Sequence, residues 1–528
     1  MPSQQAQFDI RIINGRIIDG TGAPSFRGDL GIKGDVITAI GDLEQRTAAI
    51  TIDARDQVVA PGFIDLLGQS QNSVLIDPRL EGKVRQGVTT EVTGEGHSPG
   101  PISEKNVADR LRADPTDIPR WRTLGEYMKV VEKGGSAINF AFFVGASNPR
   151  SMVIGSVDRQ ATEDELVQME QIVDQAMREG AIGLSTSLIY IPAVFSTTEE
   201  IVRLARVSVR HGGMYFTHIR DEGDRIDSAL DEAFQIGREA GIPVNIWHLK
   251  VGKKQNWGRM PEVIARIQAA RDSGLDVSAN VYPYIASSTS LSVLVPSWAL
   301  EGGYSAFLQR LQQPEERQKI EVELQNQVDA RGERGIFVSR ISVPELELYE
   351  KKFLEEISSM MGTTPVEALL RLFSGHKSSP GAIYFSMSEA DVQYALKQPW
   401  VSVGADSGAV VGAGKEAGAH PRAYGTFPRV AGHYVRNEKL FSLEEAVRKM
   451  TSQAAVRVNI YDRGILRPGM KADVIVFDPA RLLDVSKYED PHHFSVGISD
   501  VIVNGVPVLR SDRMTGALPG KVLRGQGK

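Results

Sequence analysis

The sequence predicts an α/β protein, a (β/α)8 TIM-like barrel beside a small β-sandwich domain that both ends of the chain form. In the middle of the chain an apolar, strand-like run follows each amphipathic helical pattern. This unit repeats about every 30 residues, the size of a βα unit, which predicts parallel strands. At both ends the pattern changes to short alternating apolar stretches, which are typical of antiparallel strands.

The two ends of the chain share this strand-like texture. Residues 8–60 contain IRIING, DLGIKG, VITAIG and ITIDA, separated by turns of Gly and Asp. The tail repeats the texture with ADVIVFD at 472–478 and VIVNGVPVL at 501–509. We therefore expect residues 1–60 and 466–528 to pair into one β-sandwich domain, and residues 61–465 to form the barrel.

Helix signals alternate with strand signals in the middle of the chain. Thr162 and Glu165 form a capping-box pattern, and Gly180 ends this helix before AIGLSTSL. The same unit recurs in three helices, from Thr197 to near Gly212, from Ile226 to Ala240 and from Pro261 to Ser273, each followed by a strand-like run. A doubly wound open sheet is the alternative, but no glycine-rich phosphate-binding fingerprint supports it.

Residues 287–340 interrupt the rhythm with Pro, Gly and a helical stretch rich in Gln and Glu, RLQQPEERQKIEVELQNQ. We interpret this stretch as an insertion over one end of the barrel. A lid over the site and a surface helix without a role are both compatible with it.

Composition excludes several classes of protein. The chain has 528 residues, with 41% hydrophobic and 24% charged residues, as in soluble globular proteins. The net charge of −6 without a basic patch argues against nucleic-acid or membrane partners. The polar start MPSQQAQFDI and the absence of an apolar run of about 18 residues lead us to expect a cytoplasmic protein.

The chain contains no cysteine. Disulfides, thiolate metal sites and cysteine nucleophiles are therefore excluded. Any metal ion must be held by His, Asp, Glu or a modified Lys.

Four polar residues close apolar runs, where the active sites of such barrels lie. His218 closes MYFTH, His248 closes VNIWH, Glu95 follows TTEVTG, and Asp406 follows WVSVGA. Neutral imidazole and carboxylate both suit zinc, so these side chains are candidates for one metal site.

Each of these residues also has a purely structural interpretation. A histidine at a strand end is often a hydrogen-bonded polar residue without a further role, and Asp406 precedes Ser407 and Gly408 as a turn residue would. The metal site is favoured because His218 and His248 end successive predicted strands.

Several motifs resemble the D-aminoacylase branch of the amidohydrolase superfamily, and the likeness runs nearly end to end. They are FDIRIINGRIIDGTG, VVAPGFID, QGVTTEVTGEG, THIRDEGD, HLKVG, HPRAYGTFPRV and RGILRPGMKADVIVFDPA. The resemblance implies a (β/α)8 barrel beside a β-sandwich of both termini, with an inserted segment near the mouth. It also implies zinc-dependent hydrolysis of N-acyl-D-amino acids.

The resemblance assigns roles to individual residues. His218 and His248 match the histidines that hold the family's main zinc ion, and Asp406 matches the aspartate that accepts and returns protons. Four further residues match the motifs HLK, HPRxYG, SLIY and YPY and are candidates for binding the substrate: Lys250, Arg422, Tyr190 and Tyr282.

The chain departs from the family pattern at two places. In PGFIDLLGQSQ, Leu67 and Gln69 stand where the superfamily has His-x-His. The family's GNCG-like turn contains a cysteine that bridges the metal ions. In this chain the matching sequence is GEGH, in which Glu95 or, less directly, His97 takes the place of that cysteine. We therefore expect one zinc ion, or another divalent metal, bound by Glu95, His218 and His248.

Three functions remain open at this point. The first is a deacylase acting on N-acyl-amino acids or short peptides, with Asp406 as the general base. The second is a cyclic-amide or isoaspartyl-dipeptide hydrolase, which Leu67 and Gln69 disfavour. The third is a non-catalytic relative that uses the barrel for binding. Homo-oligomer formation and the preference for D over L substrates are also open.

Overall fold

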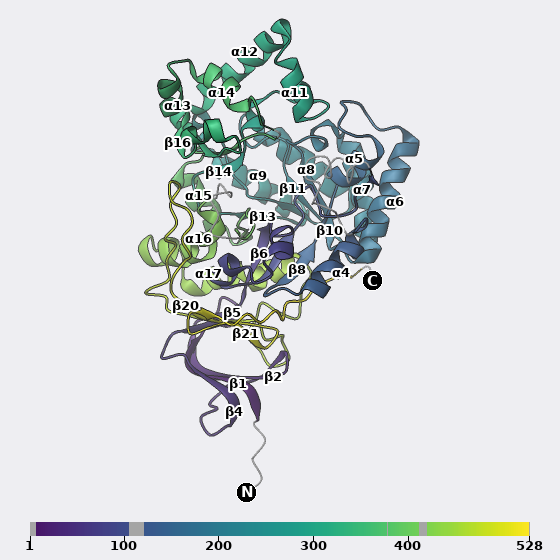
Figure 1. Ribbon diagram of the computed structural model, residues 1–528. Coiled ribbons are helices and arrows are strands. Elements are labelled where there is room, and N and C mark those ends of the chain that lie inside the picture. Colours follow the sequence, from purple (N-terminus) through teal and green to yellow (C-terminus); the bar gives the residue numbers. More distant parts are fainter. Residues whose placement is uncertain (1–6, 105–120, 377, 411–419, 527–528) are drawn as a thin grey trace.

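The computed structural model describes residues 7–104, 121–376, 378–410 and 420–526. It has three parts in series: a curved β-sheet near the N-terminus, a central barrel, and a mainly helical layer at the far end (Figure 1). Across these ranges no helix combines the length and apolar character needed to cross a bilayer.

The central barrel is built from parallel strands whose residues are almost all buried. Its described strands are β6 (Phe63–Gly68), β7 (Val88–Thr93), β8 (Asn139–Phe142) with its continuation β9 (Val144–Gly145), β10 (Gly183–Ser187), β11 (Met214–His218), β12 (Val244–Ile246), β13 (Val277–Val281) and β18 (Val401–Val403). Neighbours pair in parallel from β6 to β8 and from β9 to β18. A parallel bridge between Gly68 and Ser407 joins the two ends of the series. The (β/α)8 prediction is confirmed.

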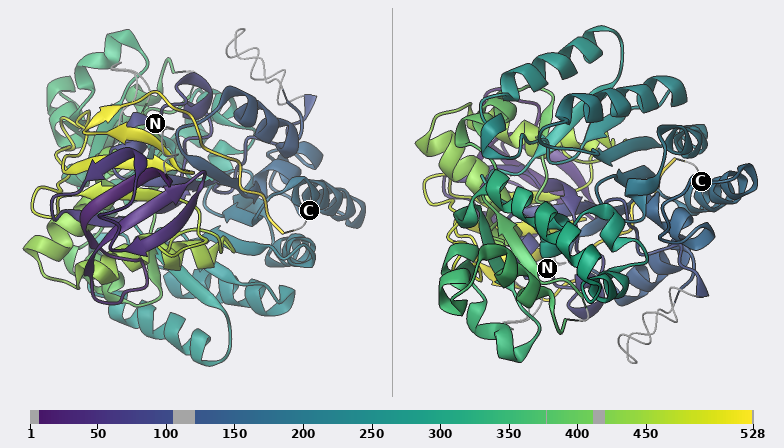
Figure 2. Two further views of the ribbon diagram at one scale, coloured as in Figure 1. Left: turned by 90° about the horizontal axis from the view of Figure 1, so that it is seen from below. Right: turned by 90° about the horizontal axis from the view of Figure 1, so that it is seen from above.

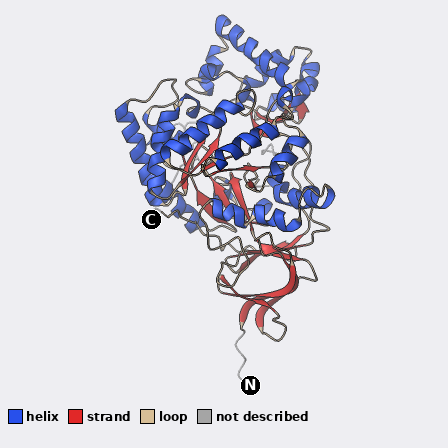
Figure 3. Ribbon diagram, turned by 180° about the vertical axis from the view of Figure 1, so that it is seen from behind, coloured by secondary structure: helices blue, strands red, loops and turns tan. Residues whose placement is uncertain are grey.

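The four expected helices are present, and the capping residues explain where the first of them starts and stops. Thr162 accepts a hydrogen bond from the Glu165 amide, and Gly180 ends the helix in a left-handed conformation that glycine adopts without strain. The helices are α6 (Glu163–Glu179), α7 (Thr198–Arg210), α8 (Ile226–Ala240) and α9 (Met260–Asp272). Figure 3 shows helices surrounding the barrel strands, with the curved sheet apart at one end.

The remaining helices of the barrel domain also lie outside the strands. They are α1 (Ser73–Ile76), α2 (Glu81–Val84), α4 (Leu124–Gly134), α5 (Ser147–Val153), α15 (Glu389–Lys397), α16 (Arg422–Arg429), α17 (Leu443–Met450) and α18 (Ser452–Arg457). Apolar residues on their inner faces pack against the strands, in the large core between helices and strands and, for α18, in a second apolar cluster.

Both ends of the chain contribute to one nine-stranded sheet. Its strands are β1 (Phe8–Ile17), β2 (Phe26–Lys33), β3 (Val36–Gly41), β4 (Ala48–Asp53), β5 (Val58–Pro61), β19 (Val474–Phe477), β20 (Ile498–Val503), β21 (Val506–Arg510) and β22 (Arg513–Met514). The two halves meet where β5 pairs with β19 in antiparallel fashion. The sheet curves around an apolar core that contains residues from both ends of the chain. The two layers of the expected sandwich are therefore parts of one continuous sheet.

The last residues leave this sheet and run along the barrel. Phe140 at the start of β8 exchanges backbone hydrogen bonds with the 521–523 segment, and the amide of Gly525 donates to the carbonyl of Gly180. The tail therefore ties the sheet to the end of the barrel opposite the strand C-termini.

A third layer is inserted between β13 and β18. Its elements are β14 (Ser287–Ser290), α10 (Ser297–Leu300), α11 (Tyr304–Arg310), α12 (Pro314–Arg331), β15 (Ile336–Arg340), β16 (Lys352–Phe353), α13 (Leu354–Met361), α14 (Pro365–Phe373) and β17 (Gly381–Tyr384). It has its own four-stranded sheet and its own apolar core. Seen from above, its helices lie over the barrel (Figure 2), and the layer runs to Tyr384, beyond the stretch 287–340.

Candidate functional site

A cavity of about 550 Å³ opens at the C-terminal ends of the barrel strands. Its wall includes Glu95, His218, His248 and Asp406, the four residues that the sequence places at strand ends. Residues of the inserted layer, from β14, α12 and β17, line the same cavity. The barrel thus brings together side chains that lie more than 300 positions apart in the sequence.

Glu95 reaches the cavity because of an unusual turn after β7. Gly94 and Gly96, on either side of it, have φ angles of 108° and 62°, a region that glycine occupies without strain. A Cβ atom at Gly96 would also lie 2.4 Å from the hydroxyl oxygen of Ser187. The sequence Gly-Glu-Gly is therefore required for the chain to turn here and point Glu95 inward.

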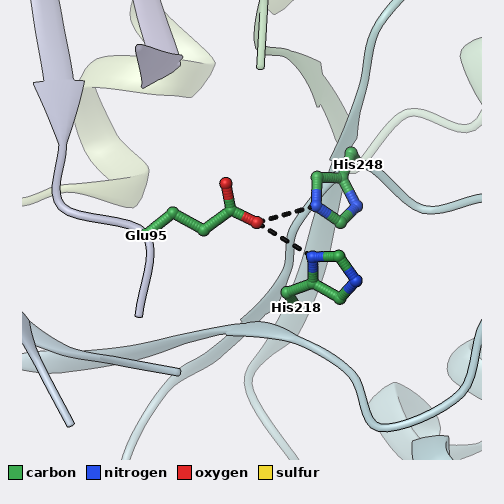
Figure 4. Close-up of side chains that lie close together, drawn as sticks. All are labelled: Glu95, His218 and His248. Atoms are coloured by element: carbon green, nitrogen blue, oxygen red, sulfur yellow. Dashed lines mark hydrogen bonds and ion pairs between the residues drawn. The ribbon is translucent and has the colours of Figure 1, made fainter. Parts of the chain in front are cut away.

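Glu95, His218 and His248 converge on one point (Figure 4). Oε1 of Glu95 lies 3.0 Å from Nδ1 of His218 and 2.9 Å from Nε2 of His248. Ligands about 2.0–2.1 Å from a tetrahedral zinc ion lie about 3.3 Å from one another, close to these separations. The three residues therefore fit a divalent metal ion with little rearrangement. His97 lies on the cavity wall outside this group.

Hydrogen bonding sets the charge state of this group. Burial raises the pKa of Glu95, but the hydrogen bonds from His218 and His248 outweigh it and hold the pKa well below its usual value. Burial and Lys250 lower the pKa of His248, while Glu222 and Asp406 raise it, with a net value of about 9. Without a metal ion, the carboxylate and a protonated imidazole stabilise each other.

The backbone holds two of these residues in strained conformations. His248 and Asp406 have φ angles of 36° and 50°, in the left-handed region that residues other than glycine seldom adopt. Hydrogen bonds fix both: the amide of His248 donates to Oδ1 of Asn280 at 2.7 Å, and the amide of Asp406 donates to the carbonyl of Leu67 at 2.7 Å. Such strain at strand ends is common where side-chain direction matters for function.

Glu222 contacts both histidines on the faces turned away from Glu95. Its carboxylate lies 3.0 Å from Nδ1 of His248 and 3.6 Å from Nε2 of His218. It also accepts a hydrogen bond of 2.5 Å from Nζ of Lys250. Burial raises its pKa, but Lys250 and the histidines lower it far more. The strand-end pattern did not identify this residue, although its position four residues after His218 in HIRDE is a usable signal.

Asp406 is held by one hydrogen bond and one ion pair. Nε2 of Gln69 donates to its Oδ1 at 2.9 Å, and Nη1 of Arg422 lies 2.8 Å from its Oδ2. Burial raises the pKa of Asp406, and the neighbouring charge of Glu95 adds to this, against the effect of Arg422. A carboxylate with a raised pKa is better suited to accept a proton near neutral pH.

The four residues matched to substrate binding divide into two pairs. Lys250 and Tyr190 are part of the cavity wall, and the ring of Tyr190 packs edge-on against His218. Tyr282 and Arg422 are not among the lining residues: both are buried, and the guanidinium of Arg422 lies 4.7 Å from the centre of the Tyr282 ring. Arg422 therefore contacts Asp406 from behind the cavity wall.

A buried charge cluster supports the floor of the site. Nζ of Lys83 lies 2.7 Å from Asp65 and 3.3 Å from Glu91, and all three side chains are inaccessible to solvent. Lys83 also donates to the carbonyl of Ser407, and Asp65 accepts from the amide of Ala405. The cluster thus ties β6 and β7 to the segment that carries Asp406.

Comparisons with known proteins identify the family of this chain. Residues 401–509 match the model of the amidohydrolase family. The chain is 38% identical over 523 residues to a D-aminoacylase of Alcaligenes xylosoxydans xylosoxydans, covering 99% of this chain and 98% of the relative.

Two solved structures cover almost the whole chain. One is a D-aminoacylase with a binuclear metal centre, described by one-metal activation and second-metal attenuation, with a TM-score of 0.82 and 36% identity over 98% of this chain and 100% of the other. The second is an N-acyl-D-glutamate deacylase of Bordetella bronchiseptica bound to zinc and a phosphonate mimic of the tetrahedral intermediate, with a TM-score of 0.83 and 33% identity over 98% and 99% of the two chains. The chain belongs to the D-aminoacylase family of amidohydrolases.

Proposed function

We propose that this protein is a metal-dependent hydrolase that removes the acyl group from N-acyl-D-amino acids. The observation that carries the proposal is the convergence of Glu95, His218 and His248 beside Asp406, in a chain 38% identical to a D-aminoacylase along its length. The preference for the D enantiomer comes from these relatives.

Glu95, His218 and His248 would hold one divalent ion, and two imidazoles with one carboxylate favour zinc. When bound, such an ion polarises the amide carbonyl and lowers the pKa of a water molecule. The Gly-Glu-Gly turn and the strained backbone at His248 fix two of the three donors, Glu95 and His248, before any ion arrives. Glu222 contacts both imidazoles from the other side, and Lys250 is paired with Glu222.

Asp406 is the proposed general base. It takes a proton from the attacking water and returns it to the leaving nitrogen, a role that its raised pKa suits. Arg422 and Gln69 leave lone pairs free on both of its oxygens, because each carboxylate oxygen has two. Lys250 and Tyr190, at the cavity wall, are the proposed contacts for the substrate carboxylate.

The alternatives from the sequence are less well supported. A cyclic-amide hydrolase of this superfamily would normally have both histidines that Leu67 and Gln69 replace. A non-catalytic relative would have no need for two strained strand-end residues, His248 and Asp406, facing one cavity.

A substrate panel tests the proposal. Purified protein loaded with zinc is assayed against N-acetyl-D-amino acids and their L enantiomers, with release of the free amine as the readout. We expect hydrolysis of D substrates, its loss on chelation, and its recovery on adding zinc. Asp406→Asn should retain the metal and lose activity by about a hundredfold or more. Equal hydrolysis of L substrates, or activity that survives both chelation and Asp406→Asn, contradicts the proposal.

A further inference from the structure

Gln69 lies between the two carboxylates of the site. Its Nε2 donates to Oε2 of Glu95 at 3.1 Å and to Oδ1 of Asp406 at 2.9 Å. An amide nitrogen carries two hydrogens, so both bonds form at once. Because ionised carboxylates only accept hydrogen bonds, the nitrogen and not the amide oxygen must face them. One neutral side chain therefore links the proposed metal ligand to the proposed base.

Because of this link, the two carboxylate oxygens of Glu95 have different partners. Oε1 faces the histidines, 3.0 Å from His218 and 2.9 Å from His248, while Oε2 is bonded to Gln69. A carboxylate that bridges two metal ions needs both oxygens, or one oxygen shared between the ions. With Oε2 hydrogen-bonded to Gln69, Glu95 cannot bridge two ions through both of its oxygens, and Oε1 faces the two histidines.

Leu67, at the first position of the superfamily's His-x-His motif, provides no metal ligand. Its side chain is fully buried in an apolar cluster that includes Val92, Phe143 and Trp247. It offers no nitrogen or oxygen to an ion, and its backbone carbonyl is occupied by the amide of Asp406. The two positions where the superfamily has histidines thus present a hydrocarbon and an amide N–H group.

The charges of the site agree with a single ion. Three carboxylates meet there, from Glu95, Glu222 and Asp406, and two cations contact them, Lys250 and Arg422. One divalent ion leaves a single excess positive charge, which an anionic substrate neutralises. A second divalent ion would raise the excess to three in a nearly buried site, which costs electrostatic free energy.

We propose that the amide of Gln69 takes the place of a second metal ion, so that the site holds one divalent ion and Gln69 positions Glu95 and Asp406 around it. This rests on the proposed function, because it concerns the same metal site. It separates this chain from the D-aminoacylase that has a binuclear centre.

The first experiment is a metal titration. Wild-type protein is dialysed against increasing zinc and its metal content is measured by elemental analysis. We expect the content to level off at about one zinc ion per chain. Two ions bound with comparable affinity overturn the proposal. The variant Leu67→His/Gln69→His, if it folds, should bind a second ion.

The second experiment isolates the amide. Gln69→Leu removes both donors and should lower kcat by about ten- to a hundredfold, since it acts as an outer partner of the ligand and the base, with little change in KM. The matched control is Gln71→Leu, two residues further on, whose side chain accepts from Thr93 and reaches neither carboxylate. It should keep wild-type kcat.

The outcomes separate the two proposals. If the wild-type protein binds no metal and hydrolyses no N-acyl-D-amino acid, both the proposed function and this inference are wrong. If the wild-type protein is active with one zinc ion, and Gln69→Leu has the same kcat, only this inference is wrong.

Discussion

Asp406 and Arg422 form an ion pair of 2.8 Å in which the side chains are only 11% and 4% exposed. Arg422 comes from α16 and Asp406 from the segment after β18, so the pair connects two parts of the barrel rim. Removing one member of such a pair leaves a buried charge without compensation, which is more costly than losing an exposed salt bridge.

Arg422→Met should shift the pH dependence of the enzyme. Arg422 lowers the pKa of Asp406, so its removal raises that pKa further, and the base must be ionised to act. The acidic limb of the kcat/KM profile should therefore move to higher pH, with a loss of stability of about 3 kcal/mol. The control is Arg429→Met. Arg429 lies on the same helix as Arg422 but is paired with Asp484, so this change leaves Asp406 and its partner in place. An unmoved acidic limb would show that Arg422 does not act on the base.

Metal binding should release protons. The pKa of His248 is about 9 in the metal-free protein, so below pH 9 this imidazole carries a proton that a metal ion must displace. Between pH 7 and 8.5 the apparent zinc affinity should rise about tenfold per pH unit. Calorimetry in buffers with different ionisation enthalpies should detect at least one proton released per ion. A pH-independent affinity would contradict the assigned state of His248.

Glu222→Gln should weaken zinc binding. Glu222 lies 3.0 Å from Nδ1 of His248 and is paired with Lys250, so it supports the ligands without facing the ion. Loss of such an outer partner lowers metal affinity by about ten- to a hundredfold. Competition with a chromogenic chelator measures this. Asp224→Asn, in the same loop but paired with Lys253, should keep wild-type affinity; equal effects in both variants would point to a general disturbance of the loop.

Lys83→Met should destabilise the barrel. The change leaves Asp65 and Glu91 buried without their cation, at a cost of about 3–5 kcal/mol. Chemical denaturation followed by circular dichroism measures the loss. The control is Lys33→Met, whose half-exposed pair with Asp9 should contribute less than about 1 kcal/mol. Similar losses in the two variants would show that the buried cluster has no special role.

Much of the fold could be predicted from local patterns. The helix α8 spans Ile226–Ala240 as periodicity and Gly241 predict, and α6 begins after Thr162 as its capping box predicts. These signals depend on side chains within one turn of each other, so they are readable without the rest of the chain. The long insertion is less readable, because α12 has few apolar residues and its layer closes only with β17, far along the sequence.

The candidate site could be predicted where a residue ends a strand. Glu95, His218, His248 and Asp406 follow apolar runs, and parallel strands bring their carboxyl ends to one edge. Glu222 and the contacts of Gln69 lie in loops, whose paths depend on packing between distant segments. For the same reason no local pattern indicates that Arg422 and Tyr282 lie behind the cavity wall.

The barrel, the sheet from both chain ends and the strand-end donors follow from local patterns, because periodicity and capping act over a few residues. Which of these donors meet depends on contacts between distant segments. Glu95 faces the histidines because two glycines turn the chain, and Asp406 reaches Gln69 because hydrogen bonds join segments 337 residues apart. Such contacts depend on closure of the barrel, a long-range event driven by burial of its apolar faces.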